Sequence, residues 1–237
     1  MRNTTTIAWK EIKIYFVSPM AYIIMAVYSA LAAYYFVTSV SGVLPEATIR
    51  GFIFPSTLIF TLLSPILTMR LLSEEQKLGT LELLMTSPVR DYEIILGKFI
   101  ASMASLLSIL IPTLYLVLVL TWFGSPDMGP ILSGYIGLIL YGMATLSVGI
   151  FASSLSGNQI VAAVLAMGVL LILSIIDLAS TYLTGTVADM VMHISLTNHL
   201  ESFARGVIDT HDIVFYCVFT SFMLFLTVRS LESRRWR

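Results

Sequence analysis

The 237-residue sequence predicts an all-α membrane protein with six transmembrane helices, built as a single domain over 1–237. The first observation behind this prediction is composition, since 57% of the residues are hydrophobic and only 11% are charged. Soluble domains carry roughly 25% charged residues, and a water-soluble fold cannot bury so much apolar surface. The second observation is a series of uncharged apolar stretches, and the third is the uneven placement of basic residues around them.

An amphipathic helix is predicted over 5–17, in the membrane interface ahead of the first span. Trp9, Ile12 and Phe16 share one face at helical spacing, and tryptophan is typical of the headgroup region. Ser18 should end this helix, because a residue that precedes proline disfavours the α conformation. The alternative is a cytoplasmic tail that has no role.

The spans follow from uncharged stretches that approach or exceed the roughly 20 residues needed to cross a bilayer. One stretch, Met128–Ile176, is too long for a single span, and the turn-forming cluster Ser153–Asn158 divides it. The last stretch is short, but Asp212 and Arg229 can lie at the two membrane interfaces. The predicted spans are 19–39, 51–70, 94–122, 130–153, 158–182 and 211–229.

The basic residues predict the orientation of the chain. Of the 13 lysines and arginines, all but Arg50 and Arg205 fall in the N-terminal segment, in the loop after the second span, or at the C-terminus. An even number of spans places these three segments on the same side. The positive-inside rule therefore predicts that both termini are cytoplasmic.

The segment 73–92 is too long for a simple connector, since helix–helix connections take about 2–8 residues and this loop has about 25. Leu78, Leu81 and Met85 follow a helical spacing, and Pro88 would end a short helix there. Either a partner docks on this helix or the helix packs on its own bundle. The sequence pattern leaves both open.

A polar stripe runs along the second predicted span, with Thr57, Thr61, Ser64 and Thr68 at helical spacing. Small hydroxyl side chains allow helices to approach closely, so packing is the first interpretation. The alternative is that the stripe lines a translocation path. In the external segment 185–210 we expect short helices in or near the outer leaflet, with an ion pair between Glu201 and Arg205, four residues apart.

Sequence motifs for catalysis and nucleotide binding are missing. The only Gly-Lys pair, Gly97-Lys98, is followed by Phe99, so the chain has no phosphate-binding loop of the G-x-x-x-x-G-K-[ST] type. Zinc-protease and serine-hydrolase motifs are also absent. We therefore expect no enzyme activity in this chain by itself, and the absence of a basic face disfavours nucleic acid as a partner.

The external side contains methionine and histidine residues, whose sulfur and imidazole groups can bind metal ions. Met190, Met192, His193, His199 and His211 all fall there, and such ligands suit transition metals. Their sequence spacing matches no compact ligand motif. The sequence therefore predicts no metal site.

Three segments carry a resemblance to a known family. Segment 74–88, EEQKLGTLELLMTSP, resembles the cytoplasmic signature of ABC-2 type transporter permeases, and so does segment 9–22, WKEIKIYFVSPMAY. Segment 198–209, NHLESFARGVID, resembles the branch that includes the gliding-motility-associated permease and the permease of nitrous oxide reductase maturation. The resemblance implies an ABC-2 permease fold, similar to type V exporters, with an N-terminal interface helix and a cytoplasmic coupling helix.

The resemblance also implies roles for particular residues. The expected contacts with an ATPase are Glu74, Glu75, Gly79, Thr80, Leu81, Glu82, Leu84 and Pro88. A second cytoplasmic contact would come from the turn with Ser154, Gly157 and Asn158. The stripe of Thr57, Thr61, Ser64 and Thr68 becomes a candidate lining of the path. Contacts with an external partner would come from His199, Glu201, Phe203 and Arg205.

By the same resemblance, the chain would be the permease of an ATP-binding cassette transporter in the bacterial cytoplasmic (inner) membrane. It would assemble with two copies of a cytoplasmic ATPase, a second permease copy and a periplasmic or auxiliary membrane protein. ATP and magnesium would bind to the ATPase, and the permease would hold no cofactor. The expected function is export of an unidentified substrate. The alternative is mechanotransmission, in which the permease moves an external partner and nothing crosses.

Overall fold

The computed structural model describes residues 2–41, 50–80, 89–124, 126–180 and 192–234. Within these ranges every regular element is a helix. Six of the helical segments are long and apolar enough to cross a membrane. The prediction of an all-α protein with six spanning helices is confirmed.

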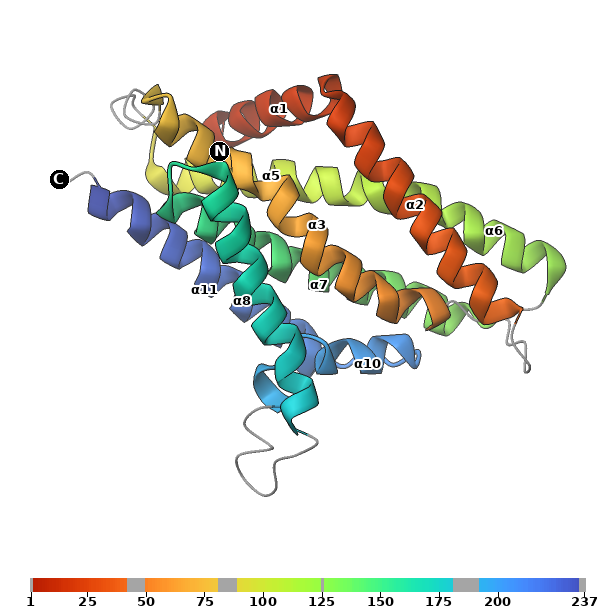
Figure 1. Ribbon diagram of the computed structural model, residues 1–237. Helices are drawn as coiled ribbons and strands as arrows, with labels where there is room; N and C mark the ends of the chain where they lie inside the picture. Colours follow the sequence, from red (N-terminus) through yellow and green to blue (C-terminus); the bar gives the residue numbers. More distant parts are fainter. Residues whose placement is uncertain (1, 42–49, 81–88, 125, 181–191, 235–237) are drawn as a thin grey trace.

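The chain begins with α1 (Arg2–Val17), which is followed at an angle by α2 (Pro19–Val40), the first span (Figure 1). Ser18 lies between them as the N-cap of α2, and its Oγ accepts a hydrogen bond from the Met20 N–H at 3.3 Å. Proline suits the first position of a helix because its missing N–H is not needed there. The predicted break at Ser18 is where α1 ends and α2 begins.

The second and fourth spans form the centre of the bundle. They are α3 (Arg50–Lys77) and α7 (Met128–Leu155). In α7, 72% of the spanning window is buried, compared with 17% in the fifth and sixth spans. The helix α3 continues about two turns beyond residue 70, where the predicted span ended.

The remaining spans surround this pair. The third consists of α5 (Asp91–Leu110), a 3₁₀ turn (Ile111–Thr113) and α6 (Leu114–Phe123). The interruption coincides with Pro112, which lacks the N–H that a continuous helix requires. The fifth and sixth spans are α8 (Gln159–Ser180) and α11 (Thr210–Arg234), and the short α10 (Asn198–Ala204) precedes α11.

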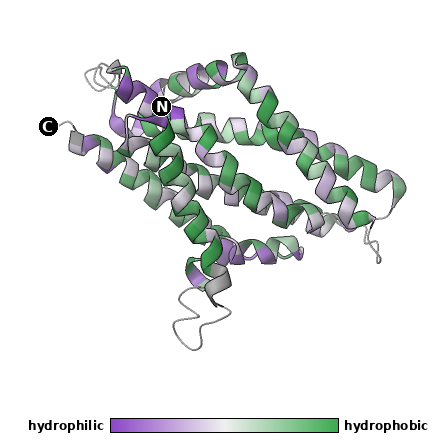
Figure 2. Cartoon of the chain, in the orientation of Figure 1, coloured by the Kyte–Doolittle hydropathy of each residue, from purple (hydrophilic) through white to green (hydrophobic). Residues whose placement is uncertain are grey.

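The bundle has two chemically different ends. Both chain termini lie at one end, together with the C-terminal turns of α3, and we call this the terminal end (Figure 1). Figure 2 shows hydrophilic residues gathered there, whereas the middle of the helices is mostly hydrophobic. The helix α10 and the first turn of α11 lie at the opposite, far end. A belt of apolar residues between two polar ends is typical of a protein that spans a bilayer.

Candidate functional site at the terminal end

A buried lysine joins three helices at the terminal end. Lys98 of α5 is 1% exposed, and its Nζ lies 2.9 Å from Glu11 Oε1 of α1 and 2.8 Å from Glu75 Oε1 of α3. We call Lys98, Glu11 and Glu75 the Lys98 cluster. Its two carboxylates compensate a buried ammonium group that would be strongly unfavourable alone. The cluster therefore ties the interface helix, the end of α3 and the start of α5 together.

Local sequence explains why these helices meet. A Cβ added to Gly97 of α5 would lie 2.9 Å from the Ile7 side chain and 3.0 Å from the Thr4 carbonyl oxygen. Glycine at this position therefore lets α1 approach α5 closely. The start of α5 is fixed by Glu93, whose Oε2 accepts the Arg90 N–H at 3.1 Å and the Asn3 amide at 3.3 Å.

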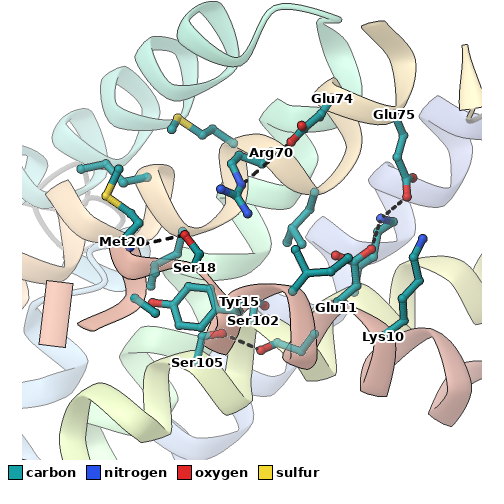
Figure 3. A pocket seen from close by; sticks show the side chains of 18 of the residues that line it. Lys10, Glu11, Tyr15, Ser18, Met20, Arg70, Glu74, Glu75, Ser102 and Ser105 are labelled. Atoms are coloured by element: carbon teal, nitrogen blue, oxygen red, sulfur yellow. Dashed lines mark hydrogen bonds and ion pairs between the residues drawn. The ribbon is translucent and has the colours of Figure 1, made fainter. Parts of the chain in front are cut away.

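A pocket of about 400 Å³ lies beside the cluster, between α1, α2, α3 and α5. Figure 3 shows Glu11 and Glu75 approaching each other from α1 and α3, with Tyr15 and Arg70 along the same pocket. The Tyr15 hydroxyl is buried and has no hydrogen-bond partner within the described part of the chain. Burial raises the pKa of Tyr15 to about 12, although the positive charge of Arg70 opposes the shift. Tyr15 is therefore neutral at physiological pH.

The last turns of α3 are also fixed to α7. Ser153 Oγ lies 3.1 Å from the backbone nitrogens of both Leu72 and Ser73, and it donates to the Met69 carbonyl at 2.9 Å. The Gln76 amide donates to the Ser154 carbonyl at 2.9 Å. Movement of the end of α3 must therefore act on α1, α5 and α7.

The predicted ATPase contacts fall into three groups. Glu74 is partly exposed, and Thr80 is exposed just after Gly79, whose φ of 69° is a backbone conformation that favours glycine and that ends α3. Glu75 is different: its Oε1 is paired with the buried Lys98 and its side chain is 19% exposed, and its contact with a partner stays a prediction. Leu81, Glu82, Leu84 and Pro88 lie outside the described residues.

The predicted coupling segment 73–92 begins within α3. Residues 73–77 form the C-terminal turns of that helix, and the predicted short helix falls mostly on residues 81–88, outside the described residues. The hydrogen bonds of residues 73–77 with Ser153 and Ser154 make the extension continuous with the spanning helix. Hydropathy could not predict this continuity, since charged residues that leave the membrane can remain in the same helix.

The second predicted contact is a turn between α7 and α8, and its three residues differ in location and burial. Gly157 and Asn158 lie in this turn, where Asn158 Oδ1 accepts the Ile160 N–H at 2.9 Å and caps α8. Ser154 is fully buried in the last turn of α7, where its hydroxyl donates to the Phe151 carbonyl. Its side chain therefore packs within the bundle, and its contact with a docked partner stays a prediction.

The polar stripe of α3 packs against α7 within this chain. Thr57, Thr61, Ser64 and Thr68 are all buried. Thr61 Oγ1 lies 3.0 Å from the Tyr141 hydroxyl, and Ser64 Oγ donates to Thr145 Oγ1 at 2.8 Å. Hydroxyl groups that are used in this way hold helices together. Within this chain the stripe serves packing, and a role in lining a path stays a prediction.

The predicted external contacts also divide by exposure. Glu201 and Arg205 are exposed on α10 and form the expected ion pair. His199 is 4% exposed and stacks on Phe215 of α11, while Phe203 is 0% exposed and lies against Gly137 of α7. Both side chains pack within the bundle, and their contact with an external partner stays a prediction.

Sequence reasoning missed the Lys98 cluster, although a signal was present. Lys98 falls inside the predicted third span, 94–122, and an ionisable residue in a span indicates a functional or structural partner by default. Its partners could not be identified from the sequence. Glu11 is 87 residues away and reaches Lys98 only because α1 packs on α5.

Six spanning helices, polar residues concentrated where both termini lie, and a buried ionic cluster at that end define a polytopic α-helical membrane protein. The family model for ABC-2 family transporter proteins matches residues 22–227. The chain belongs to this family and is a permease component of an ABC transporter. No curated protein gives a significant match.

Proposed function

We propose that this chain is the permease subunit that moves a substrate across the membrane while a separate ATPase, docked at the terminal end, hydrolyses ATP. The observation that carries the proposal is the Lys98 cluster. Its ion pairs of 2.8 and 2.9 Å connect the end of α3 to α1 and α5. A force applied to the end of α3 would therefore reach two other helices directly.

The surface next to the cluster supports docking. Leu78 is 67% exposed, and Gly79 and Thr80 are exposed beside it. These residues immediately follow α3 and precede segment 81–88, which holds the further predicted contacts Glu82 and Leu84. A single exposed leucine is common on protein surfaces, so the support for docking lies in its position directly beside the predicted contacts.

The direction of coupling follows from the placement of charge. The basic residues are concentrated at the terminal end, so the positive-inside rule favours a cytoplasmic location for both termini. ATP is a cytoplasmic molecule, and an ATPase docked at this end could reach it. The location that we propose is the bacterial cytoplasmic membrane.

The assembly that we propose contains two permease copies and two ATPases, as the family implies. Only 17% of the spanning window is buried in α8 and in α11, so these helices have apolar area for a second permease copy as well as for lipid. Membership of a transporter family favours transport over mechanotransmission without transport. The external partner and the membership of the gliding-motility and nitrous-oxide-reductase branch remain predictions.

Co-purification with the ATPase tests the docking surface. Leu78→Asp combined with Thr80→Arg replaces an apolar anchor and adds a bulky charge at the terminal end. We expect this double variant to lose stoichiometric co-purification, measured by affinity pull-down from detergent extracts. A normal yield and an unchanged size-exclusion profile would show that the variant is folded.

The far end offers a closely matched control. Ile208 is 51% exposed and Thr210 is also exposed, so Ile208→Asp with Thr210→Arg makes nearly the same chemical changes at the same spacing. This control should co-purify with the ATPase as the unmodified chain does. Retention of the ATPase by the Leu78 and Thr80 variant would overturn the docking proposal.

A further inference from the structure

The three histidines of the chain gather at the far end of the bundle. His193 and His199 come from the segment before α11, and His211 lies in the first turn of α11. The ring centroid of His211 is 5.6 Å from that of His199 and 6.1 Å from that of His193. Asp212 follows His211, and one ligand atom each from His199, His211 and Asp212 lie within 4.8 Å of one another.

Both ring nitrogens of His199 contact oxygen atoms. Its Nε2 lies 3.2 Å from the His193 carbonyl oxygen, which can only accept a hydrogen bond. Its Nδ1 lies 2.6 Å from Asp212 Oδ1, which is a hydrogen-bond distance. An imidazole nitrogen and a carboxylate oxygen are both atoms that bind transition metals, so this pair can also act as two ligands of one ion.

This arrangement is the one that metal-binding histidines adopt. A ligating histidine usually donates its other ring N–H to a carbonyl or carboxylate, which fixes the tautomer and aims the free nitrogen at the ion. The Phe215 ring stacks on His199 at a centroid distance of 3.8 Å and fixes the plane of the imidazole. Nδ1, the ring nitrogen that does not face the His193 carbonyl, therefore lies against Asp212 in a fixed orientation.

The second oxygen of Asp212 provides an independent observation. The Asp212 side chain is 8% exposed, and its Oδ2 has no hydrogen-bond partner among the described residues. A buried carboxylate oxygen without a partner is unfavourable and calls for a ligand. Asp212 also lines a pocket of about 350 Å³, together with His193, His199, His211, Glu201 and Arg205.

We propose that His199, His211 and Asp212 bind one divalent transition-metal ion of the zinc type at the far end. Two imidazoles and one carboxylate are a ligand set that zinc accepts, and its fourth position can hold water or His193. Zinc–ligand bonds of about 2.0–2.2 Å place tetrahedral ligand atoms about 3.3 Å apart. The present spacings, 2.6 Å from Asp212 Oδ1 to His199 Nδ1 and 3.7 Å to His211 Nδ1, lie on either side of that value.

Access and charge are compatible with this ion. The His211 side chain is 66% exposed, so it can rotate to complete the site and the ion can arrive from solvent. Binding would replace the hydrogen bond between His199 Nδ1 and Asp212 Oδ1 by bonds from both atoms to the ion. The ion would join α10 to the first turn of α11, two elements separated by the glycine turn at Gly206.

Spacing in the sequence concealed this site. His199 and Asp212 are 13 residues apart and come together only because the chain reverses between α10 and α11. The prediction of no metal was based on the absence of a compact ligand motif. The geometry now points to a site that no local motif describes.

Zinc titration of the purified, chelator-treated permease tests the proposal. We expect one zinc ion per chain by elemental analysis after dialysis, and a zinc-dependent rise in the midpoint of thermal unfolding. Cobalt substitution should give the visible absorption bands of a tetrahedral site. His211→Gln should reduce zinc affinity at least about 10-fold, and because His211 is exposed, this variant should remain folded.

The control is Glu201→Gln, which changes an exposed carboxylate at the same pocket and should leave zinc affinity unchanged. Asp212→Asn should abolish both the stoichiometric binding and the zinc-dependent rise in unfolding temperature. If zinc does not bind, or if His211→Gln and Asp212→Asn bind zinc as tightly as the unmodified chain, the proposal is overturned.

Discussion

Lys98 shows how a single side chain can join three helices of this bundle. Its ammonium group is fully buried, and the carboxylates of Glu11 and Glu75 compensate it from two other helices. Glu75 Oε2 has no hydrogen-bond partner within the described residues. The single positive charge of Lys98 therefore has to compensate two carboxylates. Such a cluster is sensitive to the loss of any one member, because the remaining charges stay buried.

Lys98→Met should therefore destabilise the permease by about 3–5 kcal/mol, the usual result of removing one partner from a buried ionic group. The measurement is equilibrium unfolding in detergent, followed by circular dichroism. Lys10→Met, on the exposed part of α1, is the matched control and should change stability by less than about 0.5 kcal/mol.

A triple variant distinguishes an ionic role from a packing role. When Lys98→Met is combined with Glu11→Gln and Glu75→Gln, no uncompensated charge remains in the cluster. Most of the lost stability should return, because neutral groups cost far less to bury. If the triple variant is as unstable as Lys98→Met alone, the ionic account of the cluster is wrong.

The interface between α3 and α7 combines close helix approach with hydrogen bonds between side chains. Gly149 of α7 lies against α3 so closely that an added Cβ would fall 2.0 Å from Thr68 Oγ1. Hydrogen bonds from the polar stripe to Tyr141 and Thr145 hold the same two helices together. Close approach and hydrogen bonding act jointly here, as is common where spanning helices pack.

Gly149→Ala should disturb this interface and reduce stability by about 1–3 kcal/mol through overpacking. Gly168→Ala on α8 is the matched control, since no described atom lies within 4 Å of its added Cβ. That change should be neutral or stabilising by up to about 1 kcal/mol. Thermal unfolding of both variants checks the prediction, and equal effects would contradict the close-approach argument.

The sequence predicted elements well and their contacts less well. Apolar length identified all six spans, because the bilayer imposes a simple requirement on each. The continuation of α3 to Lys77 was missed, since charge marks the membrane boundary and not the end of a helix. The role of the Thr57–Thr68 stripe was left open because packing and path-lining need the same residue types, and only the position of α7 shows the packing role within this chain.

At the scale of the whole molecule, the two ends carry different chemistry. The terminal end holds the Lys98 cluster and the exposed Leu78 and Thr80, while the far end holds the histidines and Asp212. The helices α3 and α7 extend between these ends and are fixed to each other along their length. Work done at the terminal end could therefore be passed along a rigid pair of helices.

Cross-linking can show at which end of the permease the ATPase docks. In a Cys217→Ser background, which removes the single native cysteine, Thr80→Cys and Thr210→Cys each place one thiol at opposite ends of the bundle. A short thiol-to-amine cross-linker is added to the permease–ATPase complex, and products are resolved on a denaturing gel. If the ATPase docks at the terminal end, we expect a permease–ATPase product for Thr80→Cys and none for Thr210→Cys. A product from Thr210→Cys and none from Thr80→Cys would contradict docking at the terminal end.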